Sequence, residues 1–238
     1  MDPASVRALT FDVFGTVVDW RTSVIREGEA FGKAHRVSAD WAKFADAWRG
    51  LYQPAMDEVR SGRRPWVKLD DLHRESLVRL LGDFGITGLS PADVDHFNHA
   101  WHHLDPWPDV VVGLTRLRRR FVLATLSNGN IALMVNMAKR GGLPWDAILG
   151  AEVARAYKPM PEAYQRTADA LGLRPEQCLM VAAHPSDLAA AARSGLRTAY
   201  VPRPLEFGPG RGPSEPAPGQ PFDVVASDFI ELAEKLGC

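Results

Sequence analysis

The chain has 238 residues, of which 46% are hydrophobic, and its 28 basic and 29 acidic residues give a formal net charge of −1. That length suits one large domain or a core with an inserted subdomain, and the balanced charge argues against a nucleic-acid partner or a polybasic membrane contact. No apolar run reaches membrane-spanning length, and the start of the chain lacks the basic and apolar stretches of a signal peptide. Since the two cysteines also lack metal-ligand spacing, we expect a cytoplasmic protein without a disulfide framework.

Short apolar runs alternate with helical patterns along most of the chain. This alternation predicts an α/β fold, in which a parallel sheet is connected by crossover helices. The predicted strands are residues 6–11, 121–126, 178–182, 198–201 and 223–226, and the predicted helices between them include 131–141, 161–171 and 188–194.

The segment 18–105 has a different pattern. It shows no convincing strand, aromatic residues recur in it at helical spacing, and residues 70–81 and 91–104 are predicted helices. We therefore expect an all-helical cap over residues 18–105, inserted into a core that comprises residues 1–17 and 106–238.

Two further stretches stand out by composition. Residues 116–120 form the one local basic cluster, which we interpret as the solvated end of a helix and not as a phosphate site. Residues 202–221 are rich in proline and glycine and are predicted to form an extended loop, because a strand and a helix pattern follow them.

The stretch 9–16, with the sequence LTFDVFGT, is the most informative in the chain. The first predicted strand ends on Asp12, followed by a turn at Gly15 and then by Thr16. A carboxylate at the carboxyl end of a strand lies where open α/β sheets keep their active sites, although a turn or cap aspartate is the alternative. Two residues later, Phe14 stands where a phosphatase of this design would carry a second aspartate. The pattern predicts a carboxylate nucleophile without the acid that phosphoryl transfer uses.

Later strand ends supply candidate partners for Asp12. Ser127 and Asn128 follow the second predicted strand, where they could bind a small anion or cap the next helix. Lys158 is followed by two prolines of the sequence KPMP, which restrict its backbone. An ammonium group near Asp12 would keep that carboxylate ionised, as a nucleophile requires, whereas a solvent-facing lysine is the alternative.

The loop after the strand at 178–182 contributes His184 and Asp187. Asp187 directly precedes the predicted helix, so a simple helix cap is its alternative role. His184 is either an ordinary loop histidine or a general base or donor to the substrate.

Together these motifs resemble the haloacid dehalogenase superfamily, and in detail its L-2-haloacid dehalogenase (type II) branch. The resemblance covers nearly the whole chain, from the opening block and the helical cap to the Asp187 loop. It implies a Rossmann-like core with the active site beneath the cap. It also implies a hydrolase acting on carbon–halide bonds, which converts short 2-haloalkanoic acids to 2-hydroxy acids through an aspartyl ester. No cofactor or metal is expected, and relatives are often homodimers.

The resemblance implies a role for each catalytic residue. Asp12 would be the nucleophile, and Thr16 would orient it by hydrogen bonding. Lys158 would support Asp12 and the hydrolytic step, and Asp187 would bind Lys158 or position water. His184 stands where typical members carry asparagine, so it would accept a proton from water or contact the substrate or halide.

The resemblance also implies a substrate site. The departing halide would be received by an arginine and an amide, and the substrate carboxylate would be held by a hydroxyl and two backbone N–H groups. The implied substrate-binding residues are Val13, Phe14, Arg49, Ser127, Asn128 and Tyr164. Trp20, Tyr52 and Trp66 could line the pocket or form the core of the cap.

Two rival functions stay open at this stage. A magnesium-dependent phosphatase of the same superfamily would want an acidic residue at position 183, where this chain has Ala183, and Phe14 is a second departure. A non-catalytic binding protein on a decayed scaffold is the other rival, and the retention of Asp12, Arg49 and Lys158 argues against it.

Overall fold

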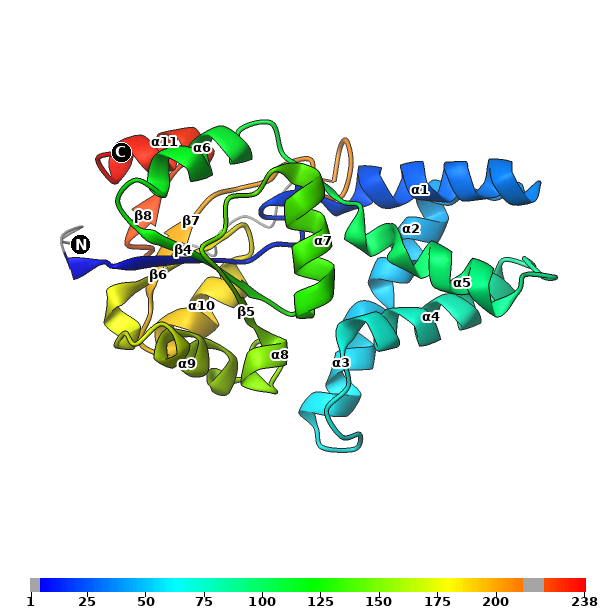
Figure 1. Ribbon diagram of the computed structural model, residues 1–238, viewed down its shortest axis with the longest axis horizontal. Coiled ribbons are helices and arrows are strands. Elements are labelled where there is room, and N and C mark those ends of the chain that lie inside the picture. The colour runs from blue at the N-terminus through cyan, green and yellow to red at the C-terminus, as the bar shows by residue number, and fades with distance from the viewer. Residues whose placement is uncertain (1–4, 212–220) are drawn as a thin grey trace.

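The computed structural model describes residues 5–211 and 221–238. Within them, six parallel strands form one sheet in the order β5-β4-β1-β6-β7-β8 (Figure 1). The α/β fold predicted from the sequence is confirmed. The strands are β1 (Ala8–Phe11), β4 (Val122–Ser127), β5 (Ala147–Gly150), β6 (Cys178–Ala182), β7 (Arg197–Tyr200) and β8 (Val224–Val225).

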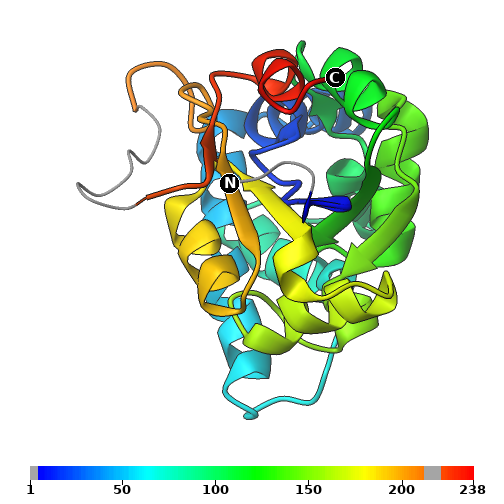
Figure 2. The same ribbon diagram turned by 90° about the vertical axis from the view of Figure 1, so that its left-hand side faces the viewer.

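Helices cover both faces of this sheet, as Figure 2 shows from the side. Successive side chains of a strand point to opposite faces, and β1 follows this rule. Leu9 and Phe11 join the apolar cluster on one face, whereas Ala8 joins the cluster on the other. One face carries α6 (Val110–Leu117), α7 (Ile131–Gly141) and α11 (Phe229–Lys235), and the other carries α8 (Ala151–Ala154), α9 (Pro161–Ala170) and α10 (Pro185–Arg193).

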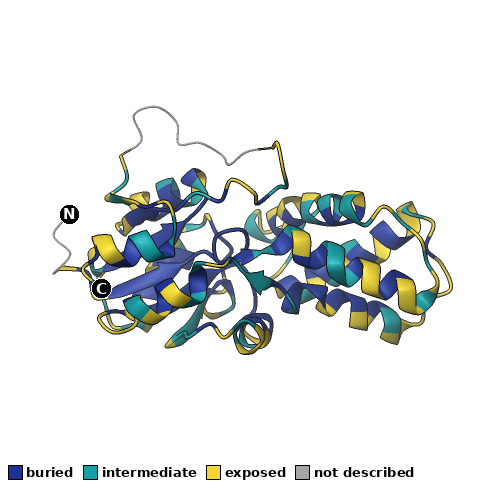
Figure 3. Ribbon diagram, turned by 90° about the horizontal axis from the view of Figure 1, so that it is seen from above, coloured by how far each residue is buried: buried dark blue, intermediate teal, exposed yellow. Residues whose placement is uncertain are grey.

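A helical unit, which we call the cap, stands beside the sheet (Figure 1). Its helices turn buried sides inward and exposed sides outward (Figure 3), and aromatic rings fill its interior, with Phe31 stacked on Phe97 at 4.3 Å. The predicted helix 91–104 is divided into α5 and a 3₁₀ turn, η2. The elements of the cap are α1 (Trp20–His35), α2 (Trp41–Gly50), α3 (Tyr52–Arg60), α4 (Leu69–Asp83), α5 (Pro91–Asn98) and η2 (His99–His102).

A two-stranded ribbon joins the cap to the core. Its strands, β2 (Val18–Asp19) and β3 (Asp105–Pro106), pair antiparallel. They were not predicted, because β2 runs directly into α1 and β3 contains Pro106, which argues against a strand. We propose this ribbon as the boundary between the core and the cap. In the parts of the chain that are described, no helix has both the length and the apolar character needed to cross a bilayer.

Several sequence predictions need correction. Strand β5 was missed, because its sequence AILG has one β-branched residue and two residues of types that are depleted in strands. Helix α10 begins at Pro185 and not at residue 188, since proline suits the first helical position. Asp187 therefore lies inside its first turn and does not precede it. Of the predicted loop 202–221, residues 202–211 form turns, and 212–220 lie outside the described residues.

The basic cluster behaves as a helix end. Helix α6 ends at Leu117, and two of the arginines hold the C-terminal segment. Arg116 donates to the carbonyl of Cys238, and Arg120 donates to the carbonyl of Leu236.

Candidate active site

A cavity of about 720 Å³ opens at the carboxyl ends of β1, β4 and β6. The core supplies its floor, and α2 and α3 of the cap supply one wall. This is the edge where parallel sheets bind ligands. The lining residues are Asp12, Phe14, Arg49, Tyr52, Gln53, Arg60, Asn128, Lys158, Pro159, Tyr164, His184, Pro185, Ser186, Asp187 and Arg193.

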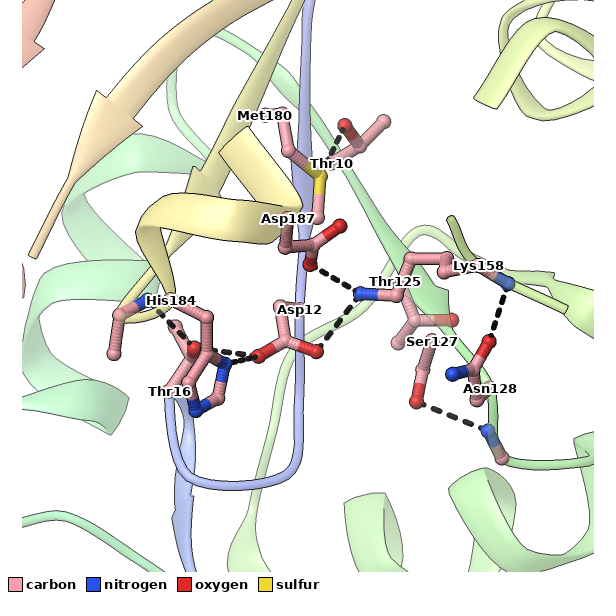
Figure 4. A network of polar contacts seen from close by, with 12 residues as sticks. Thr10, Asp12, Thr16, Thr125, Ser127, Asn128, Lys158, Met180, His184 and Asp187 are labelled. Atoms are coloured by element: carbon pink, nitrogen blue, oxygen red, sulfur yellow. Dashed lines mark hydrogen bonds and ion pairs between the residues drawn. The ribbon is translucent and has the colours of Figure 1, made fainter. Parts of the chain in front are cut away.

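Asp12 is buried on the floor with a cation beside each of its oxygens (Figure 4). Its Oδ1 accepts from Lys158 Nζ at 2.9 Å, and its Oδ2 lies 2.9 Å from His184 Nδ1. Thr16 also donates to Oδ2, at 2.7 Å. Burial alone would raise the pKa of Asp12, but the charge of Lys158 and the contacts with His184 outweigh it and hold the pKa far below its ordinary value. Asp12 is therefore ionised, as a nucleophile must be.

Lys158 lies in the turn between α8 and α9, where a second carboxylate holds its ammonium group. Its Nζ pairs with Asp187 as well as with Asp12. Burial would lower the pKa of Lys158, but the two carboxylates raise it above its ordinary value. Tyr164 donates to the other oxygen of Asp187 at 2.6 Å, and the Lys158 amide donates to Asn128 Oδ1 at 2.8 Å. The predicted contact between Asp187 and Lys158 is present.

His184 precedes α10 and bridges Asp12 to a residue that was not predicted, Glu206. His184 Nε2 lies 2.9 Å from Glu206 Oε2, and Trp20 Nε1 donates to Glu206 Oε1 at 3.1 Å. Burial would lower the pKa of His184, but its bonds with Asp12 and Glu206 raise it to about 10. The ring is an imidazolium at neutral pH and donates to both carboxylates, so it cannot accept a proton while Asp12 is ionised.

Nothing in the sequence near Glu206 marks it as a site residue, because it lies in the Pro- and Gly-rich loop. The signal that could have found Glu206 is the place of its loop in the order of the strands. The loop leaves the carboxyl end of β7, which pairs with β6 in the sheet, so an acidic residue in it can reach the same edge. Gly15 makes room for this carboxylate: its φ is +87°, and a Cβ there would clash with Glu206 Oε1.

Thr16 links two of the loops at the site. Its hydroxyl donates to Asp12 and accepts from the Ala183 amide at 2.8 Å. The hydroxyl therefore has its donor and acceptor directions fixed, which orients the Asp12 carboxylate.

Arg49 reaches the cavity from the last turn of α2. Its guanidinium lies over the ring of Tyr52, 4.2 Å from the centroid, and 5.6 Å from that of Trp20. Phe14 packs edge-on against Tyr52 at 6.2 Å. These aromatic faces hold the cation without neutralising it, so its charge is available to an anion.

Most of the predicted site residues line the cavity, but three do not. Val13, Thr16 and Ser127 are fully buried behind it. Ser127 Oγ accepts from the Gly129 amide at 3.1 Å, which is the geometry of a turn, so its substrate contact stays a prediction. Of the aromatic residues considered, Tyr52 lines the cavity, whereas Trp66 packs on Tyr157.

The residues at the site do not fit a hard divalent cation. Such a cation needs several free oxygen ligands, but both oxygens of Asp12 face cations, and Phe14 and Ala183 are apolar. Within residues 5–211 and 221–238, no group of three or more His, Cys, Asp or Glu side chains is placed to hold a metal ion.

Comparison with known proteins agrees with this geometry. The family model of haloacid dehalogenase-like hydrolases matches residues 6–195. The crystal structure of the defluorinating L-2-haloacid dehalogenase Rha0230 is 46% identical, with a TM-score of 0.94 over 98% of this chain and 96% of that one. The crystal structure of the L-2-haloacid dehalogenase PA0810 has 44% sequence identity and a TM-score of 0.92, over 97% of this chain and 98% of that one. The (S)-2-haloacid dehalogenase 1 of Pseudomonas sp. (strain CBS-3) is 29% identical over 89% of this chain and 92% of its own. The chain therefore belongs to the haloacid dehalogenase-like hydrolases and, within them, to the L-2-haloacid dehalogenases.

Proposed function

We propose that this protein hydrolyses short-chain 2-haloalkanoic acids to 2-hydroxy acids through an ester on Asp12. The observation that carries the proposal is a buried, ionised carboxylate held between Lys158 and His184 on the floor of a cavity whose wall presents Arg49. Family membership supports the same activity.

In the first step, an oxygen of Asp12 attacks the halogen-bearing carbon from behind and inverts it. The carbon–halogen bond breaks, and its electron pair leaves with the halide toward Arg49 and Asn128. The backbone N–H groups of Val13 and Phe14 would hold the substrate carboxylate. Positive charge fixed around the cavity stabilises the negative charge that moves onto the halide.

In the second step, water adds to the carboxyl carbon of the ester, and the ester bond breaks. The 2-hydroxy acid is released, and Asp12 is regenerated. Lys158 stays paired with Asp187 throughout, so the returning carboxylate meets the same ammonium group.

The phosphatase alternative has less support. Phosphoryl transfer would need a metal ligand set and a proton donor near Asp12, and the positions that could supply them hold Phe14 and Ala183. The predicted homodimer and cytoplasmic location are proposals as well. Light scattering on the purified protein would test the first, and fractionation of the native cells would test the second.

The experiment is halide release from fluoro-, chloro- and bromoacetate and from both enantiomers of 2-chloropropionate. We expect turnover of at least one haloacetate and of the L-enantiomer, and none by Asp12→Asn, which keeps the size of the side chain. Single-turnover hydrolysis in ¹⁸O-labelled water should place the label in Asp12. Label in the product alone would contradict the ester mechanism.

A further inference from the structure

We infer, given the proposed function, that Glu206 and His184 form a proton-accepting pair that becomes active only when Asp12 has been converted to the ester. In this pair His184 takes the proton from the attacking water. Glu206 is a positioning residue, because it touches His184 and not the reacting atoms.

The first support is the way Glu206 is held. Its side chain is 4% exposed, and His184 Nε2 approaches both of its oxygens, at 2.9 and 3.1 Å. Trp20 also donates to this carboxylate. A buried carboxylate costs free energy unless it is paired and hydrogen-bonded, and here His184 and Trp20 supply those contacts. Glu206 therefore sets which way the imidazole faces, with Nδ1 toward Asp12.

The second support is the anchor of the loop that carries Glu206. Arg203, three residues earlier, is buried and donates to both oxygens of Asp109, at 2.7 and 2.9 Å. It also donates to the carbonyl of Thr16 at 2.8 Å. A bidentate arginine–carboxylate pair fixes orientation as well as distance. The loop is thus fastened to the strand end that carries the nucleophile.

The third support is that Asp187, the alternative proton acceptor, is already occupied. One of its oxygens pairs with Lys158, and the other accepts from Tyr164. Burial beside Asp187 raises the pKa of Tyr164, so that hydroxyl keeps its proton. Arg49, Arg60 and Arg193, which also line the cavity, cannot accept one.

The charges around His184 then explain how its proton affinity changes. The groups that face the ring are Asp12 at the end of β1 and Glu206 from the loop after β7, and Lys158 lies beyond Asp12. Two carboxylates hold the imidazolium while Asp12 is free, and its pKa is about 10. An ester has no charge, so esterification removes one of the two and lowers the pKa of His184. The Nε2 proton stays on the side of Glu206, and Nδ1 becomes a free acceptor beside the ester.

The protons of the whole cycle balance. In the first step, the halide leaves, and the Nδ1 proton of His184 passes to solvent. In the second step, Nδ1 takes a proton from water as the oxygen of water bonds to the Asp12 carboxyl carbon. It returns that proton to the leaving alkoxide and then accepts the remaining proton from the Asp12 carboxyl group. Imidazolium and carboxylate are restored, and the one proton lost to solvent is the acid formed with the halide.

The order of proton release tests the inference in the wild-type enzyme. A single turnover of bromoacetate in weak buffer at mildly alkaline pH would be followed with a pH indicator, with halide assayed in quenched samples and the ester by intact mass. We expect close to one proton per active site to appear together with the halide, before the ester is hydrolysed. Proton release that accompanies ester hydrolysis instead would overturn the inference while leaving the proposed function intact. If neither halide nor ester forms, both proposals fail.

Glu206→Gln tests the positioning role. This variant should keep the rate of ester formation within a few-fold and lose up to the full contribution of a general base, about a hundredfold to ten-thousandfold, in ester hydrolysis. Imidazole NMR should show His184 titrating at a lower pH than in the wild type. Glu176→Gln, an exposed glutamate that pairs with Arg174, is the matched control and should change neither step. Hydrolysis at the wild-type rate, or equal loss of both steps, would show that Glu206 has no role specific to the second step and would overturn the inference.

Discussion

The two sides of Asp12 have the same arrangement of charges but use different cations. On one side, Lys158 contacts one oxygen and is held by Asp187, and on the other, His184 contacts the second oxygen and is held by Glu206. Each side is therefore a cation between two carboxylates. The difference is that an ammonium group keeps its charge over the whole physiological range, whereas an imidazole can lose its charge when its surroundings change.

This difference matches the two demands of the proposed reaction. The nucleophile needs a constant positive charge beside it to stay ionised, and Lys158 meets that demand in every state. The attacking water needs an acceptor that is free only when the ester is present, and a residue whose proton affinity follows the charge of Asp12 meets that demand. The pairing of a fixed cation with a variable one allows one carboxylate to serve in both steps.

The largest expected effect comes from removing His184, the cation whose charge can vary. His184→Ala should still form the ester through Asp12 and Lys158 but hydrolyse it about a hundredfold to ten-thousandfold more slowly. A burst of about one halide per active site, followed by slow turnover and a visible ester in the intact mass, is the expected result. A variant that retains full steady-state turnover would make His184 a bystander. One that releases no halide would place His184 in substrate or halide binding.

Removing Lys158, the cation whose charge is constant, should slow the first step, ester formation. Lys158→Met keeps much of the side-chain volume but removes the ammonium group, so Asp12 and Asp187 lose their shared partner. We expect ester formation to slow by roughly a hundredfold to a thousandfold, as when a preorganised donor is removed. The free energy of unfolding should also fall by about 3–5 kcal/mol, because a buried charge is left unpaired. Rapid-quench halide assays and urea unfolding would measure both, and accumulation of the ester would contradict this assignment.

The pH dependence of stability should separate the two sides without any substrate. The pKa of His184 is raised from 6.5 to about 10, so its stabilising contribution is complete below pH 6.5 and is lost as the pH rises toward 10. The difference in unfolding free energy between wild type and His184→Ala should therefore narrow over this window by up to about 5 kcal/mol, which is roughly 10–20 °C in Tm. The pKa of Lys158 is raised from a value already above this window, so the difference from Lys158→Met should stay constant. If both stability differences changed with pH in the same way, the contrast between a constant charge on Lys158 and a variable charge on His184 would be refuted.

A smaller effect is expected from weakening the contacts that hold the loop of Glu206. Arg203→Lys keeps the charge but loses the bidentate contact with Asp109. We expect a loss of about 1–3 kcal/mol in unfolding free energy, because buried hydrogen-bonding groups lose partners. Ester hydrolysis should slow more than ester formation, since Glu206 is carried by the same loop. Arg211→Lys, at an exposed pair with Asp46, is the control.

The two sides also differ in how far the sequence could predict them. Lys158 could be assigned because its direction depends on neighbouring prolines, and Asp12 because it ends a recognisable strand. Glu206 could not, because its position depends on a pair between Arg203 and Asp109, which lie 94 residues apart. The α/β core and the helical cap follow from periodic patterns in the chain. The ribbon of β2 and β3 and the edge strand β5 do not, because β2 runs directly into α1, β3 contains a proline, and β5 has a single β-branched residue.

The smallest effect is expected from chelation, which tests whether cations on both sides of Asp12 take the place of a metal. Excess EDTA should leave dehalogenation unchanged, and phosphate esters should not turn over when Mg²⁺ is added. The reason is electrostatic, since a divalent ion beside Asp12 would be repelled by Lys158 and by the His184 imidazolium. Phe14→Asp supplies a carboxylate at the one lining position where a phosphatase would have it, and it is the sharper form of the test. If the variant gains Mg²⁺-dependent phosphate release, the two cations do not exclude the ion, and Phe14 alone separates the two chemistries. If it gains no such activity, Phe14 alone does not separate the two chemistries, and the exclusion of the metal rests on the cations beside Asp12 together with Ala183.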